Sequence, residues 1–529
     1  MQKGRVGLII FFFILCFVII LIRLLTVTFF PDPRLQTLSK VEPFRGVIFD
    51  SSGKELAVAS PSFSIYVRPD QLTPAMRDYL FKLLIQLDFL DKENLKSLYK
   101  EKGFVWIKRK ITPSEKQVMD KLIAELKKNK AIKEDEIGVV QEQGRFYPYW
   151  VTGSVVGFVG IDNQGLGGIE YKMNKFLLQG YSVYTSIDPY LTTIIYDELK
   201  TGVLQNLAEM GSVVVMDVET REILAMASYP AYNPNDYQTI NSNTIHPSAI
   251  SEIYEPGSVM KIFSAAYAID KKIATPKYPT YYCTSEFEVG DHVFTSPAAF
   301  GYMDLTGILQ KSINVGMVQV ASSFQRQEYY AYLKALGFGT MPPVAQTGME
   351  SGILRPADQW SYLSKYMLAI GQEIGVTTLQ LASAACVIAG EGVYKPPILV
   401  KSVKDESGVE VYKPVPYQLP VISKDAAVKT LEMLKTVVSE QGTAIKAQVE
   451  GIAIAGKTGT GQVAKSGGGG YYSDLYNAVF IGFVPAVNPK IVIVVTINRP
   501  KIAEHTGGAV AAPIFANIVR RIIISTSYL

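Results

Sequence analysis

The sequence has little cysteine and little histidine, and both shortages limit the chemistry it can perform. Three cysteines are spread over 529 residues, at Cys16, Cys283 and Cys386. Cys16 lies in an apolar run, so at most one disulfide is available to the rest of the chain. The three histidines are scattered, and no Cys-x-x-Cys pair or Cys/His cluster occurs. We therefore expect no metal site and no cofactor.

An excess of charge of one sign is also missing. Charged residues make up 19% of the chain and the net charge is only +4, which gives no support for a nucleic-acid-binding face. Hydrophobic residues make up 48%, so extensive disorder is excluded. A chain of this length and composition is long enough for two folded domains with their own cores.

One long apolar run is present, near the N-terminus. Residues 6–30 are apolar apart from Arg23 and a few threonines, and Lys3 and Arg5 precede them. About 20 apolar residues suffice to cross a membrane as a helix, and basic residues stay on the cytoplasmic side. A cleaved signal peptide is the alternative, but bulky residues follow this run. We expect a cytoplasmic tail at 1–5, a retained anchor at 6–30, and the remainder outside the cytoplasm.

Residues 31–180 form a first region without a catalytic constellation. Residues 43–60 predict a strand, a turn and a second strand. Residues 70–137 carry Lys, Glu and Leu at helical spacing, which indicates helices with a solvated face. We interpret this region as an α+β pedestal for scaffolding, docking or dimerisation.

Residues 181–529 form a second region. A strand hairpin is predicted at 211–228, and three further strands at 451–456, 477–484 and 490–498, followed by a helix at about 508–524. The long stretch between the two strand groups indicates helix and loop. The pattern predicts an α+β fold in which one mainly antiparallel sheet takes strands from both ends of the region and a helical subdomain is inserted between them.

The first motif that suggests chemistry is Ser258-Val-Met-Lys261, preceded by Pro256-Gly257. The residues from Ser258 onward can form a helix, and residues three apart share a helix face. A partly desolvated lysine beside a serine hydroxyl can accept its proton and activate it as a nucleophile. Alone the pattern is weak, because Ser-x-x-Lys also occurs at Ser51 and Ser97.

Two further motifs follow at larger spacing. Ser312-Ile313-Asn314 places a hydroxyl and a carboxamide two residues apart, suited to proton relay and amide binding, although both residue types also cap helices. Lys457-Thr458-Gly459-Thr460 follows directly after the predicted strand 451–456. A glycine at a sheet edge permits close approach of a substrate backbone, and the lysine and threonines can bind a carboxylate. A strand-ending turn is the structural alternative.

The order of the three motifs is more specific than any one of them. Ser-x-x-Lys, Ser-x-Asn and Lys-Thr-Gly in succession are the signature of serine β-lactamases and penicillin-binding proteins. The chain resembles the class B penicillin-binding proteins, and the resemblance extends to Arg45-Gly46-x-Ile48-x-Asp50, to Gly371-Gln372-Glu373 and to Gly507-Gly508. Residues 242–253 and 171–184 depart from the pattern of many relatives.

The resemblance implies a penicillin-binding transpeptidase domain, with a five-stranded sheet, at 181–529 and a role for each motif residue. Ser258 would attack the D-Ala-D-Ala carbonyl of a stem peptide, and Lys261 would act as base. The N–H groups of Ser258 and Thr460 would stabilise the oxyanion. Further expected roles are proton transfer and peptide binding by Ser312 and Asn314, and orientation of the substrate carboxylate by Lys457 and Thr458. Thr458, Gly459 and Thr460 are the expected substrate-binding residues. β-Lactams would acylate Ser258.

The resemblance also implies partners and a location. We expect a single-pass protein of the cell (inner) membrane, with its catalytic domain periplasmic or extracellular. The implied partners are a membrane glycan polymerase of the SEDS type and other divisome proteins. Tyr254-Glu255-Pro256-Gly257-Ser258 resembles the cell-division type more than the Tyr-Pro-Pro-Gly-Ser run of elongation enzymes, so we favour septal cell-wall synthesis.

Three alternatives are less consistent with the sequence. A bifunctional class A enzyme needs a glycosyltransferase domain, for which the first region is too short. A soluble β-lactamase has no use for an anchor and a first domain. A non-catalytic sensor or division scaffold does not need three intact motifs.

Overall fold

The computed structural model describes residues 17–20, 43–465 and 469–529. The predicted anchor at 6–30 falls outside these residues, except for 17–20, which are helical. Within the described ranges, no helix combines the length and the apolar composition needed to cross a membrane. Contacts divide the chain into residues 1–44 and 45–529, and the second unit holds both folded regions.

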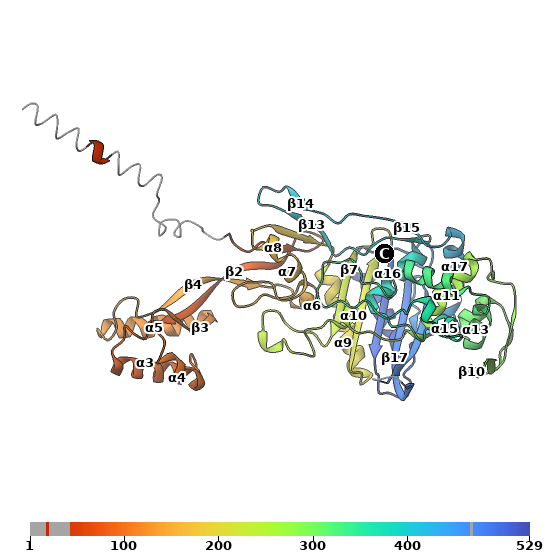
Figure 1. The fold of residues 1–529 in the computed structure, drawn as a ribbon, viewed down its shortest axis with the longest axis horizontal. Helices are drawn as coiled ribbons and strands as arrows, with labels where there is room; N and C mark the ends of the chain where they lie inside the picture. The colour runs from red at the N-terminus through yellow and green to blue at the C-terminus, as the bar shows by residue number, and fades with distance from the viewer. Residues whose placement is uncertain (1–16, 21–42, 466–468) are drawn as a thin grey trace, which may run out of the picture. The chain divides into compact units, whose positions relative to one another are not determined.

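The first folded region is built around a long, bent strand. Strand β2 (Glu55–Val67) pairs with β1 (Ile48–Phe49) near its start and with β3 (Val105–Ile111) and β4 (Ile137–Phe146) further along. Helices α3 (Pro74–Gln86), α4 (Leu95–Leu98) and α5 (Pro113–Lys128) accompany them (Figure 1). A separate apolar core lies between these helices and strands.

The expectation of a helical stretch throughout 70–137 is wrong at β3. The segment Val-Trp-Ile-Lys-Arg-Lys-Ile places three consecutive basic residues between apolar ones along a half-buried strand. Its basic side chains are neutralised from neighbouring elements: Arg109 and Lys110 lie 3.0 and 3.3 Å from Glu142 on β4. A rule based on local helical spacing cannot detect this pairing.

A larger sheet joins the first region to the second. Strand β1 pairs in parallel with β5 (Ser182–Thr185), which in turn pairs with β13 (Val400–Lys404) and, beyond it, β14 (Glu410–Tyr412). Residues separated by more than 350 positions therefore belong to one sheet.

A buried ion cluster stabilises this junction. Glu170 receives hydrogen bonds from the Nε of Arg45 at 2.8 Å and the Nε of Arg145 at 2.6 Å, and the three side chains are at most 1% exposed. Burial of two guanidinium groups is tolerated only because the carboxylate lies between them.

The predicted sheet of the second region is confirmed, with strands from both ends of the domain. Its order is β16 (Ala455–Ala464), β17 (Tyr471–Val484), β18 (Ile491–Asn498), β6 (Met210–Asp217) and β7 (Ile223–Tyr229), and every pair is antiparallel. Both faces are covered, which explains why the central strands are continuous apolar runs.

Helices cover the two faces of this sheet. Helices α9 (Pro189–Gln205) and α18 (Ala511–Ser525) pack together on one face, where Phe515 contacts Phe480 with ring centroids 4.8 Å apart. Helix α16 (Thr378–Ala389) lies on the opposite face, where the Thr378 hydroxyl bonds to Thr496 at 3.0 Å. The observed α18 matches the helix predicted at about 508–524.

The inserted helical subdomain follows β7. It contains α11 (Met260–Asp270), α12 (Leu305–Lys311), α13 (Asn314–Ala321), α14 (Arg326–Ala335) and α15 (Ser364–Ile370), and α17 (Lys424–Val437) leads back to β16. One continuous core joins these helices to the sheet. Strand β16 is the edge of the sheet, so one of its backbone edges is not paired by another strand of the described ranges.

We expect Glu170→Ala to destabilise the protein by about 3–5 kcal/mol, because two buried guanidinium groups lose their counter-charge. Urea unfolding of both proteins measures the change. Asp162→Ala is the matched control. It removes an ion pair to Arg109, but the Asp162 carboxylate is 61% exposed, so we expect a cost of only about 0–1 kcal/mol. Equal effects of the two substitutions would contradict the structural role of the cluster.

Candidate active site

Ser258 lies on a tight turn at the start of a buried helix. Residues Gly257–Val259 form one turn of 3₁₀ helix, and the α-helix begins at Met260. The sequence expectation of a helix from Ser258 is therefore correct, apart from the tighter first turn. Gly257 adopts φ +59 and donates its N–H to Gly371 at 3.1 Å, which leaves Ser258 partly exposed above a buried helix.

The amine of Lys261 is positioned to accept the proton of Ser258. Its Nζ lies 3.1 Å from the Ser258 Oγ, 2.7 Å from the Ser312 carbonyl oxygen and 2.6 Å from the Asn314 Oδ1. The last two atoms can only accept hydrogen bonds. A neutral amine has two N–H groups to donate to them, and its lone pair then remains for the hydroxyl of Ser258.

Burial makes the neutral form of Lys261 the favoured one. The side chain is fully buried, and no carboxylate among the described residues is hydrogen-bonded to it. Desolvation, and secondarily the positive charge of Lys457, lowers its pKa well below the ordinary value of 10.5.

Ser312 and Asn314 occupy a break between two helices. Ser312 ends α12 in a left-handed conformation with φ 61, and Asn314 is the first residue of α13. Ser312 ends the helix through its backbone and not through a side-chain cap, and its side chain faces both lysines. Its Oγ lies 2.8 Å from the Nζ of Lys457 and 3.5 Å from that of Lys261.

Lys457 lies within an edge strand and not after one. The predicted strand at 451–456 is wrong in its limits, because β16 begins at Ala455, where pairing with Phe483 starts. Gly451, with φ +83, belongs to a turn that precedes it. Besides Ser312, the Lys457 Nζ bonds to the Thr458 carbonyl oxygen at 3.0 Å, and burial lowers its pKa to about 7.

Glycines allow β16 to approach the turn that carries Ser258. A Cβ atom on Gly459 would lie 2.5 Å from the Pro256 carbonyl oxygen, and one on Gly461 would lie 1.9 Å from that of Glu255. Any side chain at these positions would push the strand away. The backbone of Thr460, between the two glycines, is therefore held beside Ser258.

The two threonines of the motif are fixed by other segments. The Thr458 hydroxyl lies 2.8 Å from that of Thr443, and the Thr460 hydroxyl accepts the Gly507 N–H at 3.1 Å. Two hydroxyls and the amine of Lys457 therefore lie at one end of the unpaired strand edge. Hydroxyl and ammonium donors of this kind suit a carboxylate.

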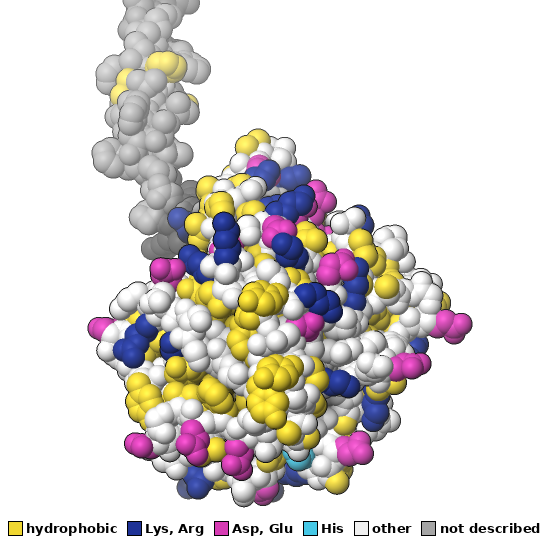
Figure 2. Space-filling view, turned by 90° about the vertical axis from the view of Figure 1, so that its right-hand side faces the viewer, with side chains coloured by type: hydrophobic (Ala, Val, Ile, Leu, Met, Phe, Trp, Pro, Cys, Tyr) yellow, Lys and Arg dark blue, Asp and Glu magenta, His cyan; other side chains and the backbone are white. Residues whose placement is uncertain are grey.

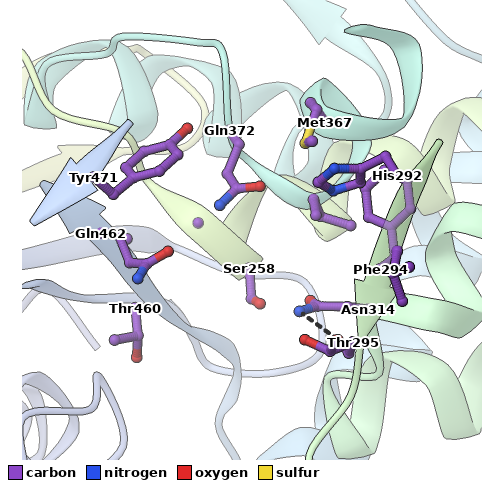
Figure 3. Close-up of a pocket in the computed structure, with 14 residues that line it drawn as sticks. Ser258, His292, Phe294, Thr295, Asn314, Met367, Gln372, Thr460, Gln462 and Tyr471 are labelled. Atoms are coloured by element: carbon purple, nitrogen blue, oxygen red, sulfur yellow. Dashed lines mark hydrogen bonds between the residues drawn. The ribbon is translucent and has the colours of Figure 1, made fainter. Parts of the chain in front are cut away.

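A pocket of about 450 Å³ opens over Ser258. Figure 3 shows Ser258, Asn314 and Thr460 on its floor and sides. Several of the residues that line it lie outside the three catalytic motifs: His292, Phe294, Met367, Gln372, Gln462 and Tyr471. They come from a hairpin at 286–295, from α15 and the segment after it, and from the β16–β17 hairpin, which no local pattern relates to Ser258.

Of the residues predicted for the site, Ser258, Asn314 and Thr460 line this pocket. The hydrogen bonds join Ser258, Lys261, Ser312, Asn314 and Lys457 into one network. Chemically the arrangement provides a serine hydroxyl, a buried amine that can accept its proton, backbone N–H groups and the edge of a sheet. On the face shown in Figure 2, basic and acidic side chains are interspersed.

Comparison with known proteins agrees with this geometry. Residues 211–520 match the family described as the penicillin binding protein transpeptidase domain, and residues 40–184 match the penicillin-binding protein dimerisation domain. The peptidoglycan D,D-transpeptidase FtsI of Escherichia coli K12 is 29% identical over 522 residues, which span 92% of this chain and 84% of FtsI. A probable peptidoglycan D,D-transpeptidase PenA of Neisseria meningitidis is 28% identical, over 92% and 85% of the two chains.

Solved structures of penicillin-binding proteins are also similar to this chain. Penicillin binding protein 3 of Mycobacterium tuberculosis, complexed with aztreonam, has a TM-score of 0.73 and 25% identity, over 91% of this chain and 96% of that one. The transpeptidase domain of Burkholderia pseudomallei penicillin-binding protein 3 has a TM-score of 0.57 and 30% identity, over 64% and 96%.

The rate at which an acylating reagent modifies Ser258 should rise with pH as Lys261 loses its proton. Since burial and Lys457 lower the pKa of Lys261, we expect the rising limb well below pH 10.5. The pseudo-first-order rate measured from acid to alkaline pH gives the profile. In Lys261→Met the limb should disappear and the rate should fall by about 10²–10⁴-fold. A half-maximum near 10.5 would contradict a neutral Lys261 in the resting site.

Proposed function

We propose a function for this chain from one premise: the chain belongs to the family of penicillin-binding protein transpeptidases. It is a peptidoglycan D,D-transpeptidase that cross-links stem peptides through an acyl-enzyme on Ser258. The observation that supports this most strongly is the geometry of Lys261, whose two donated hydrogen bonds leave its lone pair for Ser258.

In the first half-reaction a stem peptide ending in D-Ala-D-Ala pairs with the free edge of β16. Its terminal carboxylate binds Lys457, Thr458 and the neighbouring threonine hydroxyls. The Ser258 Oγ forms a bond to the carbonyl carbon of the penultimate D-Ala while its proton passes to Lys261. The N–H groups of Ser258 and Thr460 stabilise the oxyanion.

Collapse of the tetrahedral intermediate breaks the C–N bond. The leaving D-Ala amine takes a proton that originates from Ser258 and is held by Lys261, with Ser312 between the two lysines as the relay. The products are free D-Ala and an ester on Ser258. Asn314 holds the substrate amide and keeps the N–H groups of Lys261 directed away from Ser258.

In the second half-reaction an amine from a neighbouring stem peptide attacks the ester carbonyl. Lys261 accepts the proton of this amine and returns one to the Ser258 Oγ as the C–O bond breaks. The new amide is the cross-link, and the free serine is restored. A β-lactam follows the first half-reaction only, because its leaving nitrogen stays attached. Related structures complexed with aztreonam and ampicillin support this part of the proposal.

The location and partners form the second part of the proposal. Residues 6–30 anchor the chain in the cell membrane with the N-terminus in the cytoplasm, and the catalytic domain faces the wall. The protein acts in septal synthesis with divisome proteins and a glycan polymerase of the SEDS type. The support is the anchor-like sequence and the similarity to transpeptidases named FtsI.

Ser258→Ala should abolish cross-linking without unfolding the protein. We expect the wild-type chain to release D-Ala from stem peptides and form cross-linked dimers, which liquid chromatography with mass spectrometry detects. The variant should form none while its thermal midpoint is unchanged. Cross-linking by the variant would refute the transpeptidase proposal, and so would a lack of cross-linking by the wild-type chain.

A fluorescent fusion of the full chain should concentrate at the division septum, and depletion should produce filaments. Fluorescence microscopy of dividing cells measures both. Lateral localisation with conversion of rods to spheres upon depletion would place the protein in elongation and refute the septal role.

A further inference from the structure

A second cavity lies beyond the catalytic pocket, on the other side of Gln462 and Tyr471. It has a volume of about 840 Å³, and these two residues line both cavities. In Figure 3 they stand on the side of Ser258 opposite Asn314. Its other walls include residues 252–255, just before Ser258, residues 373–375, and further residues of the β16–β17 hairpin. None of the catalytic roles above uses these walls.

The upstream residues of a donor peptide bound along β16 would extend into this cavity. The carboxylate-binding groups lie at Thr458, and the oxyanion N–H lies at Thr460, so a paired substrate runs antiparallel to β16. Residues upstream of the scissile bond then lie beside Gln462, two residues or about 7 Å further along the strand. Gln462 is where the two cavities meet.

One carboxylate in the second cavity lacks a counter-charge. Among the acidic residues that line it, Glu252 pairs with Arg499 at 3.0 Å and Glu373 pairs with Arg355 at 2.8 Å. Glu255 has no cationic partner in the described part of the chain. Lys465, the other basic residue of the lining, is exposed and forms no ion pair within the described residues.

The hydrogen bonds of Glu255 are also incomplete. Its Oε1 accepts the Tyr471 hydroxyl at 3.2 Å and the Glu373 N–H at 3.0 Å, whereas its Oε2 is buried and has no partner among the described residues. An unpaired, desolvated carboxylate is costly, and burial raises the pKa of Glu255 to about 7. A bound cation would remove this penalty once a neighbouring side chain moves to admit it.

The substrate carries such a cation. Donor and acceptor stem peptides are copies of one peptide, and the cross-link forms on an amine of the acceptor. The donor therefore carries the same amine, upstream of its D-Ala-D-Ala end. We propose that the second cavity binds the side-chain ammonium of the acyl donor, with Glu255 as its counter-ion. This inference rests on the transpeptidase function proposed above and adds a specificity-determining residue to it.

The test compares two synthetic donors that differ only in whether the upstream side-chain amine is free or N-acetylated. The release of D-Ala is measured at low donor concentration with excess hydroxylamine as the common acceptor, so that the donor's own amine does not compete. We expect kcat/KM to be about tenfold higher for the free amine in the wild-type protein, as for a charge-assisted hydrogen bond.

Glu255→Gln should reduce this preference to about one, since the amide keeps an acceptor for Tyr471 and loses the charge. Glu252→Gln is the matched control. It removes one carboxylate from the same cavity, but that carboxylate is already paired with Arg499, so the preference should persist. The wild-type preference should also rise as pH increases through about 7, where Glu255 ionises.

The outcomes separate the two proposals. Turnover of both donors without an amine preference, or a preference that Glu255→Gln retains, would overturn the ammonium site while leaving the transpeptidase function intact. An effect of Glu255→Gln on the acceptor dependence alone would also overturn it, because the cavity would then serve the acceptor. Failure of the wild-type protein to release D-Ala from either donor would refute the function itself.

Discussion

The burial of Lys261 without a carboxylate partner is the constraint on which the rest of the site depends. Burial lowers the pKa of this lysine well below its ordinary value and so favours the neutral amine, which has two hydrogens and one lone pair. The carbonyl of Ser312 and the carboxamide of Asn314 take the two hydrogens, so the lone pair belongs to Ser258. Both acceptors lie at the break between α12 and α13, which places them next to the amine.

The second lysine and the sheet edge complete the arrangement. Lys457 contributes a positive charge that further disfavours protonation of Lys261, and it holds the Ser312 hydroxyl between the two amines. Gly459 and Gly461 allow the strand that carries Lys457 to touch the turn that carries Ser258. Ser258, Lys261, Ser312 and the edge of β16 are thus positioned by contacts between the helical subdomain and the sheet.

The sequence was informative where chemistry and local pattern coincide. The sheet with strands from both ends of the domain, the helix after Ser258 and the three motifs could all be predicted, because apolar strands and motif spacing are local signals. Strand β3 could not be predicted, because its charged side chains are neutralised by β4, which is distant in sequence. The start of β16 was misplaced because the apolar residues of 451–454 precede the pairing with β17. Glu255, Gln462 and Tyr471 form a cavity wall only after folding, so no spacing rule connects them.

The central claim is that this geometry makes Ser258, and not the nearby Ser312, the nucleophile. Peptide mapping by mass spectrometry after treatment with a penicillin tests it directly, because trypsin places the two serines in different peptides, 222–261 and 312–326. The account predicts the adduct mass on the 222–261 peptide alone and no adduct in Ser258→Ala. An adduct on the 312–326 peptide, or labelling that survives Ser258→Ala, would contradict it.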